Sequence, residues 1–287
     1  MRELWKHFAL FAACCATTWY VRGPYFAATL MGILACHEAG HYVTSRLHGV
    51  ETSLPYFIPI PISFGTLGAV IRMKKPIDDR RTLFDVGASG PIAGLVVAIP
   101  LLVIGLWISP LEPIKVGDGL EGNSILYVLL KFAVFGRWLP GDGLDVQLHP
   151  MAFAAWVGLL VTAINLMPIG QLDGGHIARA VLGQSHERWS ARLNVALPAL
   201  GVVVGGVMLV RASHAGLAFW DALLYAKDGA LPWMIWAVLL GLMRRSAGEY
   251  HPPVGDVPLD GRRRIGAVVM AVIFVLIVTP VPMSSAL

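Results

Sequence analysis

Long apolar runs bounded by charged residues, proline or glycine dominate the sequence. A helix needs about 20 mostly apolar residues to cross a bilayer, although a helix interrupted by Gly or Pro can be shorter. The pattern predicts seven spans, near residues 8–21, 25–43, 84–108, 151–168, 193–210, 231–243 and 265–281. A weaker apolar stretch at 124–136, interrupted by Lys131, predicts an interfacial or re-entrant helix. We therefore predict an all-α polytopic membrane protein with about six to eight transmembrane helices.

The segment after the second predicted span has a different pattern. The run "LPYFIPIPI" (54–62) is broken by prolines, and "SFGTLGAVIRMK" (63–74) mixes glycine with residues that favour strands. This pattern predicts a small β-hairpin or an exposed edge strand near residues 56–74. The alternative is a loop that dips into the membrane and merely joins two spans.

Composition supports a membrane protein. The chain is 56% hydrophobic and 14% charged, with a mean hydropathy of +0.67, whereas an ordinary soluble domain is roughly 25% charged. The first apolar run has the basic and apolar regions of a signal peptide, but the next run follows within a few residues, so we expect a retained helix. Cys14, Cys15 and Cys36 all lie in apolar runs and indicate no disulfide framework.

Basic residues are distributed unevenly between alternate loops. With a cytoplasmic amino terminus and seven alternating spans, 16 of the 22 lysines and arginines lie on the cytoplasmic side. The six on the other side are Arg22, Lys115, Lys131, Arg137, Arg211 and Lys227. Because basic loops resist translocation, this bias favours the cytoplasmic orientation. The end of the second span and the loop at 170–192 then lie at similar depth on the cytoplasmic side. We expect the basic run at 262–264 to contact anionic lipid, with no nucleic-acid partner.

Two histidines and a glutamate stand at the end of the second predicted span, in "HEAGH" (37–41). Helical residues four apart share a face, so His37 and His41 can bind one metal ion through neutral imidazoles. Glu38 lies beside that face, where it can act as a general base toward an activated water. The alternative is a set of interior polar residues satisfied by neighbouring helices. A charged side chain at membrane depth costs a few kcal/mol, however, so we interpret Glu38 as a functional residue.

A catalytic zinc keeps three protein ligands and one open position, so a third donor must come from elsewhere. Asp173, in "INLMPIGQLDGGH" (164–176), is the best candidate because it stands at similar depth and its charge would offset that of zinc. His48 lies about 10 Å further along the helix axis, too far for the same ion. His176 can either bind the metal or support a ligand. We expect it to support Asp173 without binding the metal itself.

Asn165 and Pro168 stand where the fourth predicted span ends. A side-chain amide near zinc can polarise a scissile carbonyl or hold the substrate backbone, and an interhelical hydrogen bond is an equal alternative for Asn165. Pro168 is a second candidate for substrate or transition-state support, although it also simply ends the helix. Gly174 and Gly175 are expected to permit a tight turn behind Asp173.

Together, "HEAGH" and "NLMPIGQLDGGH" resemble the paired motifs of the site-2 protease family of intramembrane zinc metalloproteases. The similarity continues through residues 56–95 and 149–177. "SLPYFIP" (53–59) resembles the branch of the family that lacks a PDZ domain, and residues 110–150 are too few for such a domain. The resemblance implies one catalytic zinc ion held by His37, His41 and Asp173, with Glu38 as the general base.

Members of this family cut transmembrane or membrane-proximal segments of other proteins, often after another protease has shortened the substrate. The resemblance therefore implies a transmembrane protein substrate, in addition to membrane lipids as partners. We expect one metalloprotease domain at 1–287, with a catalytic core at about 25–182 and additional transmembrane helices within 1–24 and 190–287. The predicted edge strand would align an unwound substrate by strand addition. Its candidate residues are Gly65, Thr66, Leu67, Gly68, Ala69 and Val70.

Two other functions fit the same residues. A zinc transporter or sensor would bind the ion without requiring Glu38, and a scaffold would grip transmembrane helices without cutting them. The complete set of His37, Glu38, His41 and Asp173 favours the protease, because a non-catalyst has no need of all four. For localisation we expect a bacterial inner membrane, with an organelle membrane as the alternative.

Overall fold

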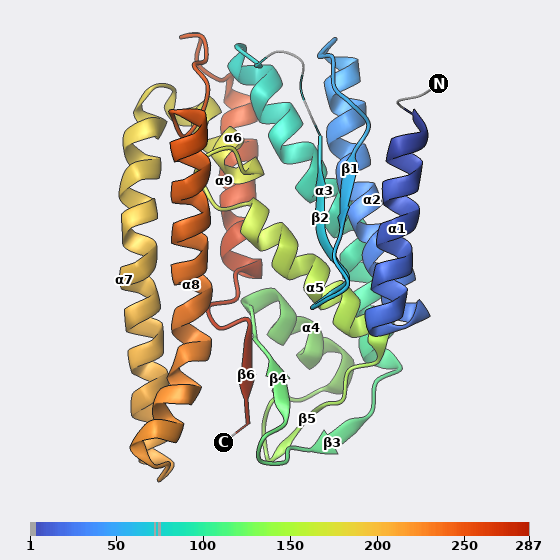
Figure 1. The fold of residues 1–287 in the computed structure, drawn as a ribbon, viewed down its shortest axis with the longest axis vertical. Helices are drawn as coiled ribbons and strands as arrows, with labels where there is room; N and C mark the ends of the chain where they lie inside the picture. The colour runs from blue at the N-terminus through green and yellow to red at the C-terminus, as the bar shows by residue number, and fades with distance from the viewer. Residues whose placement is uncertain (1–3, 72, 74–75, 287) are drawn as a thin grey trace.

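The computed structural model describes residues 4–71, 73 and 76–286. Helices make up most of this part of the chain, and three two-stranded antiparallel pairs join them (Figure 1). The helices are α1 (Leu4–Arg22), α2 (Pro24–Leu47), α3 (Arg80–Trp107), α4 (Ile125–Phe135), α5 (Pro150–Asn165), α6 (Asp173–Leu182), α7 (Ser185–His214), α8 (Phe219–Ala247) and α9 (Gly261–Ile277). The strands are β1 (Tyr56–Pro59), β2 (Thr66–Val70), β3 (Leu111–Pro113), β4 (Gly119–Glu121), β5 (Leu144–Val146) and β6 (Met283–Ser285).

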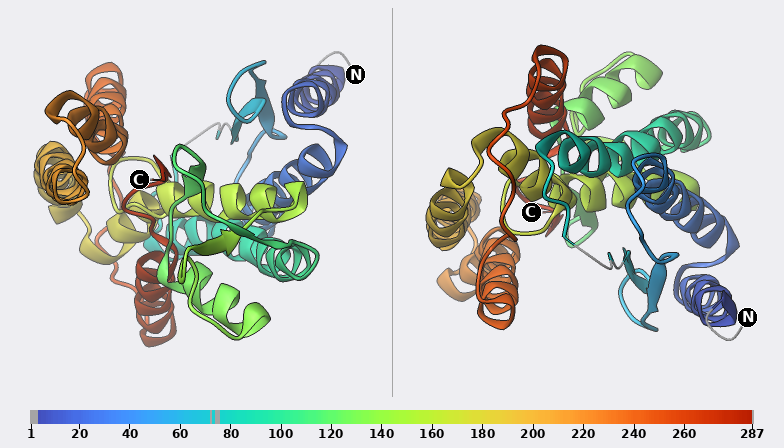
Figure 2. Two further views of the ribbon diagram at one scale, coloured as in Figure 1. Left: turned by 90° about the horizontal axis from the view of Figure 1, so that it is seen from below. Right: turned by 90° about the horizontal axis from the view of Figure 1, so that it is seen from above.

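The helices form a central group with a further group on each side. In the centre, α2 packs against α3, and α3 also packs against α5 and α6. The long pair α7 and α8 stands on one side of this centre, and α1 with the β1–β2 hairpin stands on the other (Figure 1). Seen along the long axis, α3 and α5 lie near the middle of the molecule (Figure 2). Segments from both halves of the chain therefore meet in the centre.

Local sequence signals explain where the central helices begin. α2 starts with Pro24 in its first turn, where a missing N–H costs nothing. The Asp79 carboxylate caps α3 by accepting a hydrogen bond from the Thr82 N–H at 2.9 Å. Pro91 and Pro100 lie inside α3. Prolines are tolerated within membrane helices because neighbouring helices satisfy the freed backbone groups.

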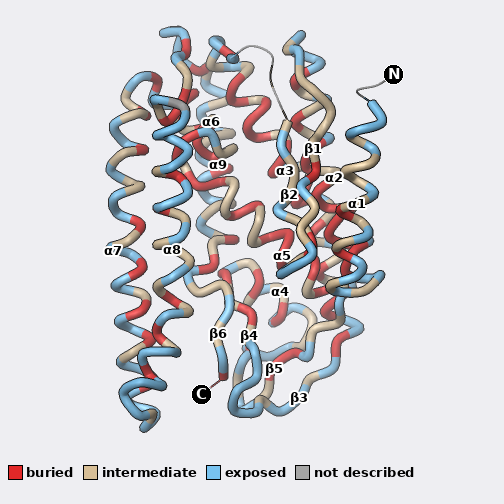
Figure 3. Tube along the Cα trace, viewed as in Figure 1, coloured by how far each residue is buried: buried red, intermediate tan, exposed pale blue. Residues whose placement is uncertain are grey.

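Burial divides the molecule in the way expected of a membrane protein. Buried residues concentrate in α2, α3 and α5, whereas α7, α8 and much of α9 are exposed along their length (Figure 3). Many of these exposed residues are large and apolar, including Val195 (76% exposed), Val202 (63%) and Ile265 (67%). Apolar surface of this extent suits lipid contact, so the predicted all-α membrane class is confirmed.

The predicted number of spans is higher than the number of described helices that are long and apolar enough to cross a membrane. Among the described residues, three helices are long and apolar enough to cross a membrane, within Arg80–Trp107, Ser185–His214 and Phe219–Ser246. The shortfall has a physical cause, because α2 carries the polar "HEAGH" residues and α5 has only 16 residues. At 1.5 Å per residue, α5 extends about 24 Å, less than the hydrocarbon thickness of about 30 Å.

Two predicted segments gain sharper bounds. The predicted span at 231–243 is the second half of α8, which begins twelve residues earlier at Phe219. Its first half carries Asp221, Lys227 and Asp228, which interrupt the apolar pattern. The stretch at 124–136 forms the short helix α4, bounded by Ser124 as its N-cap and Gly136 as its C-cap. Of the basic residues that predicted the orientation, Arg2, Arg72, Lys74 and Lys75 lie outside the described residues.

The predicted hairpin is present. β1 pairs antiparallel with β2, with Tyr56 opposite Val70 and Phe57 opposite Ala69. The hairpin packs on α1, where the Thr17 hydroxyl donates to the Gly65 carbonyl at 2.7 Å. A side chain at Gly65 would overlap the backbone of α1 at Thr18, so this close approach requires glycine. Positions 72 and 74 of the predicted range lie outside the described residues.

A buried charged cluster stabilises the region around α4. The ammonium group of Lys131 is fully buried, 3.2 Å from Asp145 Oδ1 and 3.8 Å from Glu121 Oε1. The Tyr127 hydroxyl donates to Glu121 Oε1 at 2.7 Å. These four residues, here called the Lys131 cluster, connect α4 with β4 and β5. The charge of Lys131, which interrupts the apolar pattern, is therefore balanced by two carboxylates inside the protein.

Candidate metal centre

α2 presents His37 and His41 on its inner face, one helical turn apart. Both imidazoles are buried, and Glu38, beside His37, is buried as well. The spacing of four residues brings the rings to the same side of the helix, with their centroids 4.9 Å apart. The two Nε2 atoms are 3.2 Å apart. The helix therefore places two nitrogen donors at one point.

Asp173 reaches this point from the first turn of α6. The connection between α5 and α6 folds back over that turn, so the backbone comes very close to itself. A Cβ at Gly174 would overlap the Leu166 carbonyl oxygen, and a Cβ at Gly175 would overlap the Gly170 carbonyl oxygen. Glycine is needed at both positions because no side chain fits, and both lie within helix α6 rather than in the tight turn that the sequence predicted.

The donor atoms of the three residues are separated by the distances expected between ligands of a tetrahedrally coordinated metal ion. The Asp173 carboxylate oxygens lie 3.1 Å from His37 Nε2 and 3.2 Å from His41 Nε2. All three donor groups lie within 4.8 Å of one another. With zinc bonds of about 2.0–2.2 Å, neighbouring ligand atoms in a tetrahedral site stand about 3.3 Å apart. Two imidazoles and one carboxylate at these distances fit a single zinc ion.

α3 supplies no ligand, yet it determines which nitrogen of His41 faces the metal. His41 Nδ1 lies 2.7 Å from the Val86 carbonyl oxygen, which can only accept, so Nδ1 carries the proton and donates. In the neutral ring, Nε2 then keeps its lone pair for a metal ion. A Cβ at Gly90 would overlap the His41 ring, and a Cβ at Gly94 would lie 3.2 Å from His37 Nδ1. The two glycines of α3 therefore make room for both imidazoles.

Glu38 is placed beside the donors without joining them. It is 6% exposed, and no hydrogen bond or ion pair of its carboxylate is found within the described part of the chain. Its oxygens are not among the fully buried side-chain atoms that lack a partner, so a small molecule such as water can reach them. A carboxylate in this position fits a general base toward a water at a catalytic metal.

With the geometry described, comparison with known proteins is informative. The profile of peptidase family M50 matches residues 25–209, which include both histidines, Glu38 and Asp173. The chain belongs to peptidase family M50. The resemblance to the site-2 proteases, predicted from the two motifs, is confirmed by this match.

Several relatives of this M50 chain are plant proteins. "Probable zinc metalloprotease EGY1, chloroplastic" of Arabidopsis thaliana is 35% identical over 162 residues, covering 54% of this chain and 29% of the relative. "Probable zinc metalloprotease EGY2, chloroplastic" of Arabidopsis thaliana is 31% identical over 179 residues, covering 61% and 32%. "Probable zinc metalloprotease EGY3, chloroplastic" of Oryza sativa subsp. indica is 27% identical over 281 residues, covering 90% and 42%. The chain thus spans less than half the length of these relatives.

The other predicted site residues of the M50 chain lie around the donors rather than among them. Asn165 ends α5, is half-buried, and makes no side-chain hydrogen bond within the described part of the chain. Pro168 lines an apolar groove between α6 and α9. His48 turns away from the metal centre, because its Nε2 lies 3.0 Å from Asp85 Oδ2.

His176 is directed toward another histidine. Its Nδ1 lies 2.7 Å from His251 Nε2, and His251 Nδ1 lies 2.8 Å from the Pro252 carbonyl oxygen. Because that carbonyl can only accept, His251 donates through Nδ1 and accepts the His176 N–H through Nε2. Burial lowers the pKa of His251 to about 4, which keeps the ring neutral. The first helical turn after Asp173 is thereby fixed to the α8–α9 connection.

Several residues that position the donors were missed by sequence reasoning. Ser190 accepts a hydrogen bond from the Gly170 N–H at 3.3 Å, and its oxygen lies 3.0 Å from His186 Nε2. This contact holds the α5–α6 connection to α7. His251, His186 and the Val86 carbonyl carry no motif, and their spacing along the chain contains no signal of proximity. His186 and His251 stand in polar segments of the sequence, where a solvent-exposed histidine is the ordinary expectation.

Proposed function

We propose that this M50 chain is a zinc metalloendopeptidase that hydrolyses peptide bonds in or near transmembrane segments of membrane-anchored proteins. The convergence of His37 Nε2, His41 Nε2 and the Asp173 carboxylate at 3.1–3.2 Å carries this proposal. The relatives named above are probable zinc metalloproteases, which supports the same chemistry. A regulated cut in a membrane protein is the process that this chemistry would serve.

Each residue has a role that follows from its position. His37, His41 and Asp173 hold the zinc ion, which supplies Lewis acidity and lowers the pKa of a water. Glu38 accepts a proton from the attacking water at its carboxylate and returns that proton to the departing amine nitrogen. The free amide of Asn165 donates a hydrogen bond to the substrate carbonyl oxygen or backbone, where negative charge develops. Pro168 supports the substrate or the transition state beside Asn165, and His176 supports Asp173 without binding the metal.

Substrate alignment is assigned to the β1–β2 hairpin. β1 pairs with β2 and packs on α1, while β2 pairs with no second strand among the described residues. Leu67 is 69% exposed and Val70 is 54% exposed on this outer strand. A substrate helix must unwind before its carbonyls are accessible, and an edge strand gives the unwound segment hydrogen-bond partners. Residues 65–70 would therefore hold the substrate as an added strand.

The orientation and partners complete the proposal. We place the amino terminus and the active site on the cytoplasmic side of a bacterial inner membrane or an organelle membrane, the orientation that the charge bias predicts for seven alternating spans. The names of the relatives describe those proteins as chloroplastic, which supports the organelle alternative. The substrate is a transmembrane protein that another protease shortens first, and membrane lipids surround the enzyme.

Glu38→Gln tests the function directly. The variant keeps the shape and the zinc ligands but removes the proton acceptor, so we expect cleavage of membrane peptides to fall by about 10²–10⁴-fold. Zinc content, measured by metal analysis, stays at the wild-type value. Glu112→Gln, at an exposed carboxylate of β3, serves as the matched control and retains activity. Cleavage that persists in Glu38→Gln or under a chelator would overturn the zinc and Glu38 mechanism. A wild-type protein that binds zinc but cleaves no membrane peptide would favour the transporter, sensor or scaffold functions.

Leu67→Pro tests the edge strand. Proline removes a backbone donor from β2, so we expect cleavage to fall at least about tenfold with zinc content unchanged. Leu67→Ala keeps the backbone N–H and is the control for loss of the side chain. Equal cleavage rates for the proline and alanine variants would show that β2 aligns no substrate.

A further inference from the structure

An apolar groove runs between α9 and the α5–α6 region, next to the metal centre. Its volume is about 480 Å³. One wall is a single face of α9, formed by Arg264, Ala267, Val268, Met270, Ala271 and Phe274. Ile177, Ala178, Val181 and Leu182 of α6 form the opposite wall, together with Leu166, Pro168 and Gly174. Val268 is 63% exposed, so the groove opens onto the outer surface of the helix bundle.

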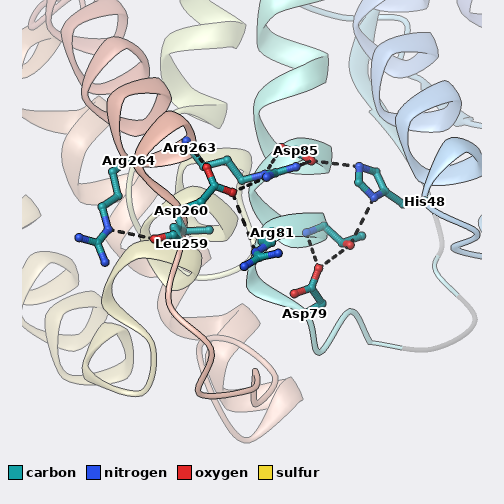
Figure 4. A network of polar contacts seen from close by, with 9 residues as sticks. His48, Asp79, Arg81, Asp85, Leu259, Asp260, Arg263 and Arg264 are labelled. Carbon is teal, nitrogen blue, oxygen red and sulfur yellow. Dashed lines mark hydrogen bonds and ion pairs between the residues drawn. The ribbon is translucent and has the colours of Figure 1, made fainter.

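Arg264 is the one charged residue of the groove, and it stands at the end where α9 begins. Its Nε donates to the Leu259 carbonyl oxygen at 3.0 Å, which fixes the guanidinium group (Figure 4). The two Nη atoms make no hydrogen bond or ion pair with any described residue. Figure 4 shows this guanidinium apart from the neighbouring ion-pair network. Its remaining donors are therefore available to a ligand.

The neighbouring arginines differ from Arg264 in what they contact. Arg263 is fully engaged, donating to Asp85 through Nε at 2.9 Å and Nη2 at 2.6 Å, and to Asp260 through Nη1 (Figure 4). Arg262 is exposed and lines no part of the groove. The three consecutive arginines therefore have three different environments. Of these three arginines, only Arg264 has unpaired Nη atoms and lines the apolar groove.

We propose that this groove binds one anionic phospholipid, with an acyl chain between α9 and α6 and the phosphate on Arg264. A phospholipid has the matching layout, because it is apolar along its chain and carries a phosphate at one end. Guanidinium groups bind phosphate through paired hydrogen bonds. Arg264 also stands in the first turn of α9, at one end of the apolar groove, as a phosphate stands at one end of an acyl chain.

The length and lining of the groove suit an acyl chain. From Arg264 to Phe274 the groove follows ten residues of α9, or about 15 Å at 1.5 Å per residue. Apart from Arg264 at one end, its lining residues carry no charge. A single extended acyl chain can lie along this length with its headgroup at the Arg264 end.

The lipid would also support the catalytic connection. Leu166, Pro168 and Gly174, which line the groove, lie on both sides of the chain segment that ends in Asp173. A chain filling the groove packs against this segment through Leu166, Pro168 and Gly174. The bound lipid would therefore restrict the position of the third metal donor, so zinc retention depends on lipid as well as on the ligands.

Lipid titration of the purified full chain in detergent, followed by native mass spectrometry, tests the proposal. The probes are phosphatidylglycerol and phosphatidylcholine with identical acyl chains. We expect one retained phosphatidylglycerol and about a tenfold preference over phosphatidylcholine. Arg264→Gln abolishes the preference, and Ala271→Trp, which fills the groove, weakens binding of both lipids at least about tenfold. Arg262→Gln and Val269→Trp, outside the groove on the same helix, bind as the wild type does.

Circular dichroism and gel-filtration profiles equal to those of the wild type confirm that each variant is folded, and the lipid result does not depend on proteolytic activity. Equal retention of the two lipids, or wild-type retention by Arg264→Gln and Ala271→Trp, would overturn the proposal. Displacement of the lipid by a transmembrane substrate peptide would also overturn it, because the groove would then belong to the substrate.

Discussion

The metal centre and the Lys131 cluster are both buried polar groups in an apolar protein, but their charges are balanced differently. In the Lys131 cluster, the ammonium group faces the Asp145 and Glu121 carboxylates, and Tyr127 donates to Glu121. At the metal centre, two imidazole nitrogens and the Asp173 carboxylate face one point, and Glu38 has no partner among the described residues. One cluster is completed by the protein, whereas the other requires an added cation.

This difference separates stability from function. A group with its own counter-charge contributes to folding, and removal of one partner leaves a buried charge uncompensated. A group of converging acceptors contributes little to folding by itself and gains its energy from the ion that it binds. Substitutions in the two regions should therefore change different measured quantities.

Lys131→Met should give the largest effect on stability. Loss of the ammonium group leaves Asp145 and Glu121 buried without a cation, so the free energy of unfolding should fall by about 3–5 kcal/mol. Equilibrium unfolding in mixed micelles measures this change, and zinc bound per folded molecule should not change. Lys115→Met, at an exposed lysine near β3, is the control. A Lys131→Met protein that loses zinc but not stability would reverse the comparison.

Gly90→Ala should change metal affinity more than folding. The new Cβ would overlap the His41 ring, which must tilt away from its place beside Asp173. We expect zinc affinity to fall about 10–100-fold, the range typical when a ligand loses its support. Competition with a chelator measures the affinity. Gly206→Ala on α7 meets nothing within 4 Å and should bind zinc as the wild type does.

A smaller, pH-dependent effect should come from the histidines behind Asp173. Burial lowers the pKa of His251 to about 4, below its ordinary value of about 6.5. The unfolded chain therefore binds more protons between these values, so stability is complete above about pH 6.5 and declines as the pH falls toward 4. The decline from this group is at most about 1.4 kcal/mol per pH unit. Unfolding midpoints at several pH values measure the slope.

His251→Asn should flatten that slope, because asparagine does not titrate. The matched control is His214→Asn, at an exposed histidine near the end of α7, which should leave the slope unchanged. An identical slope in wild type and His251→Asn would mean that other groups determine the acid sensitivity of this region.

The sequence was sufficient to predict the parts of the site that repeat a local pattern. The spacing of His37 and His41 follows from one helical turn, and the charge at Asp173 is conspicuous in an apolar chain. The hairpin followed from glycine and proline between strand-forming residues. Membrane class followed from composition, and family membership followed from the two motifs together.

Long-range packing explains what the sequence did not reveal. The His41 hydrogen bond to the Val86 carbonyl depends on how α2 crosses α3. The identity of residue 86 does not predict this bond, because the acceptor is a backbone group. The His176–His251 contact joins residues 75 positions apart. The number of spans was overestimated because apolar runs do not distinguish helices packed inside the protein from helices that cross lipid on their own. The first half of α8 was not predicted, because its charged residues interrupt the apolar pattern although the helix continues through them.

The role of α3 has a consequence for protein engineering. Transplanting the two histidines, the glutamate and the aspartate onto another helical bundle would copy all the chemistry but not the conditions under which it works. The recipient would also need a crossing helix with glycines four residues apart and a carbonyl aimed at one imidazole. A helix that donates nothing to the metal is therefore part of the minimal transferable unit.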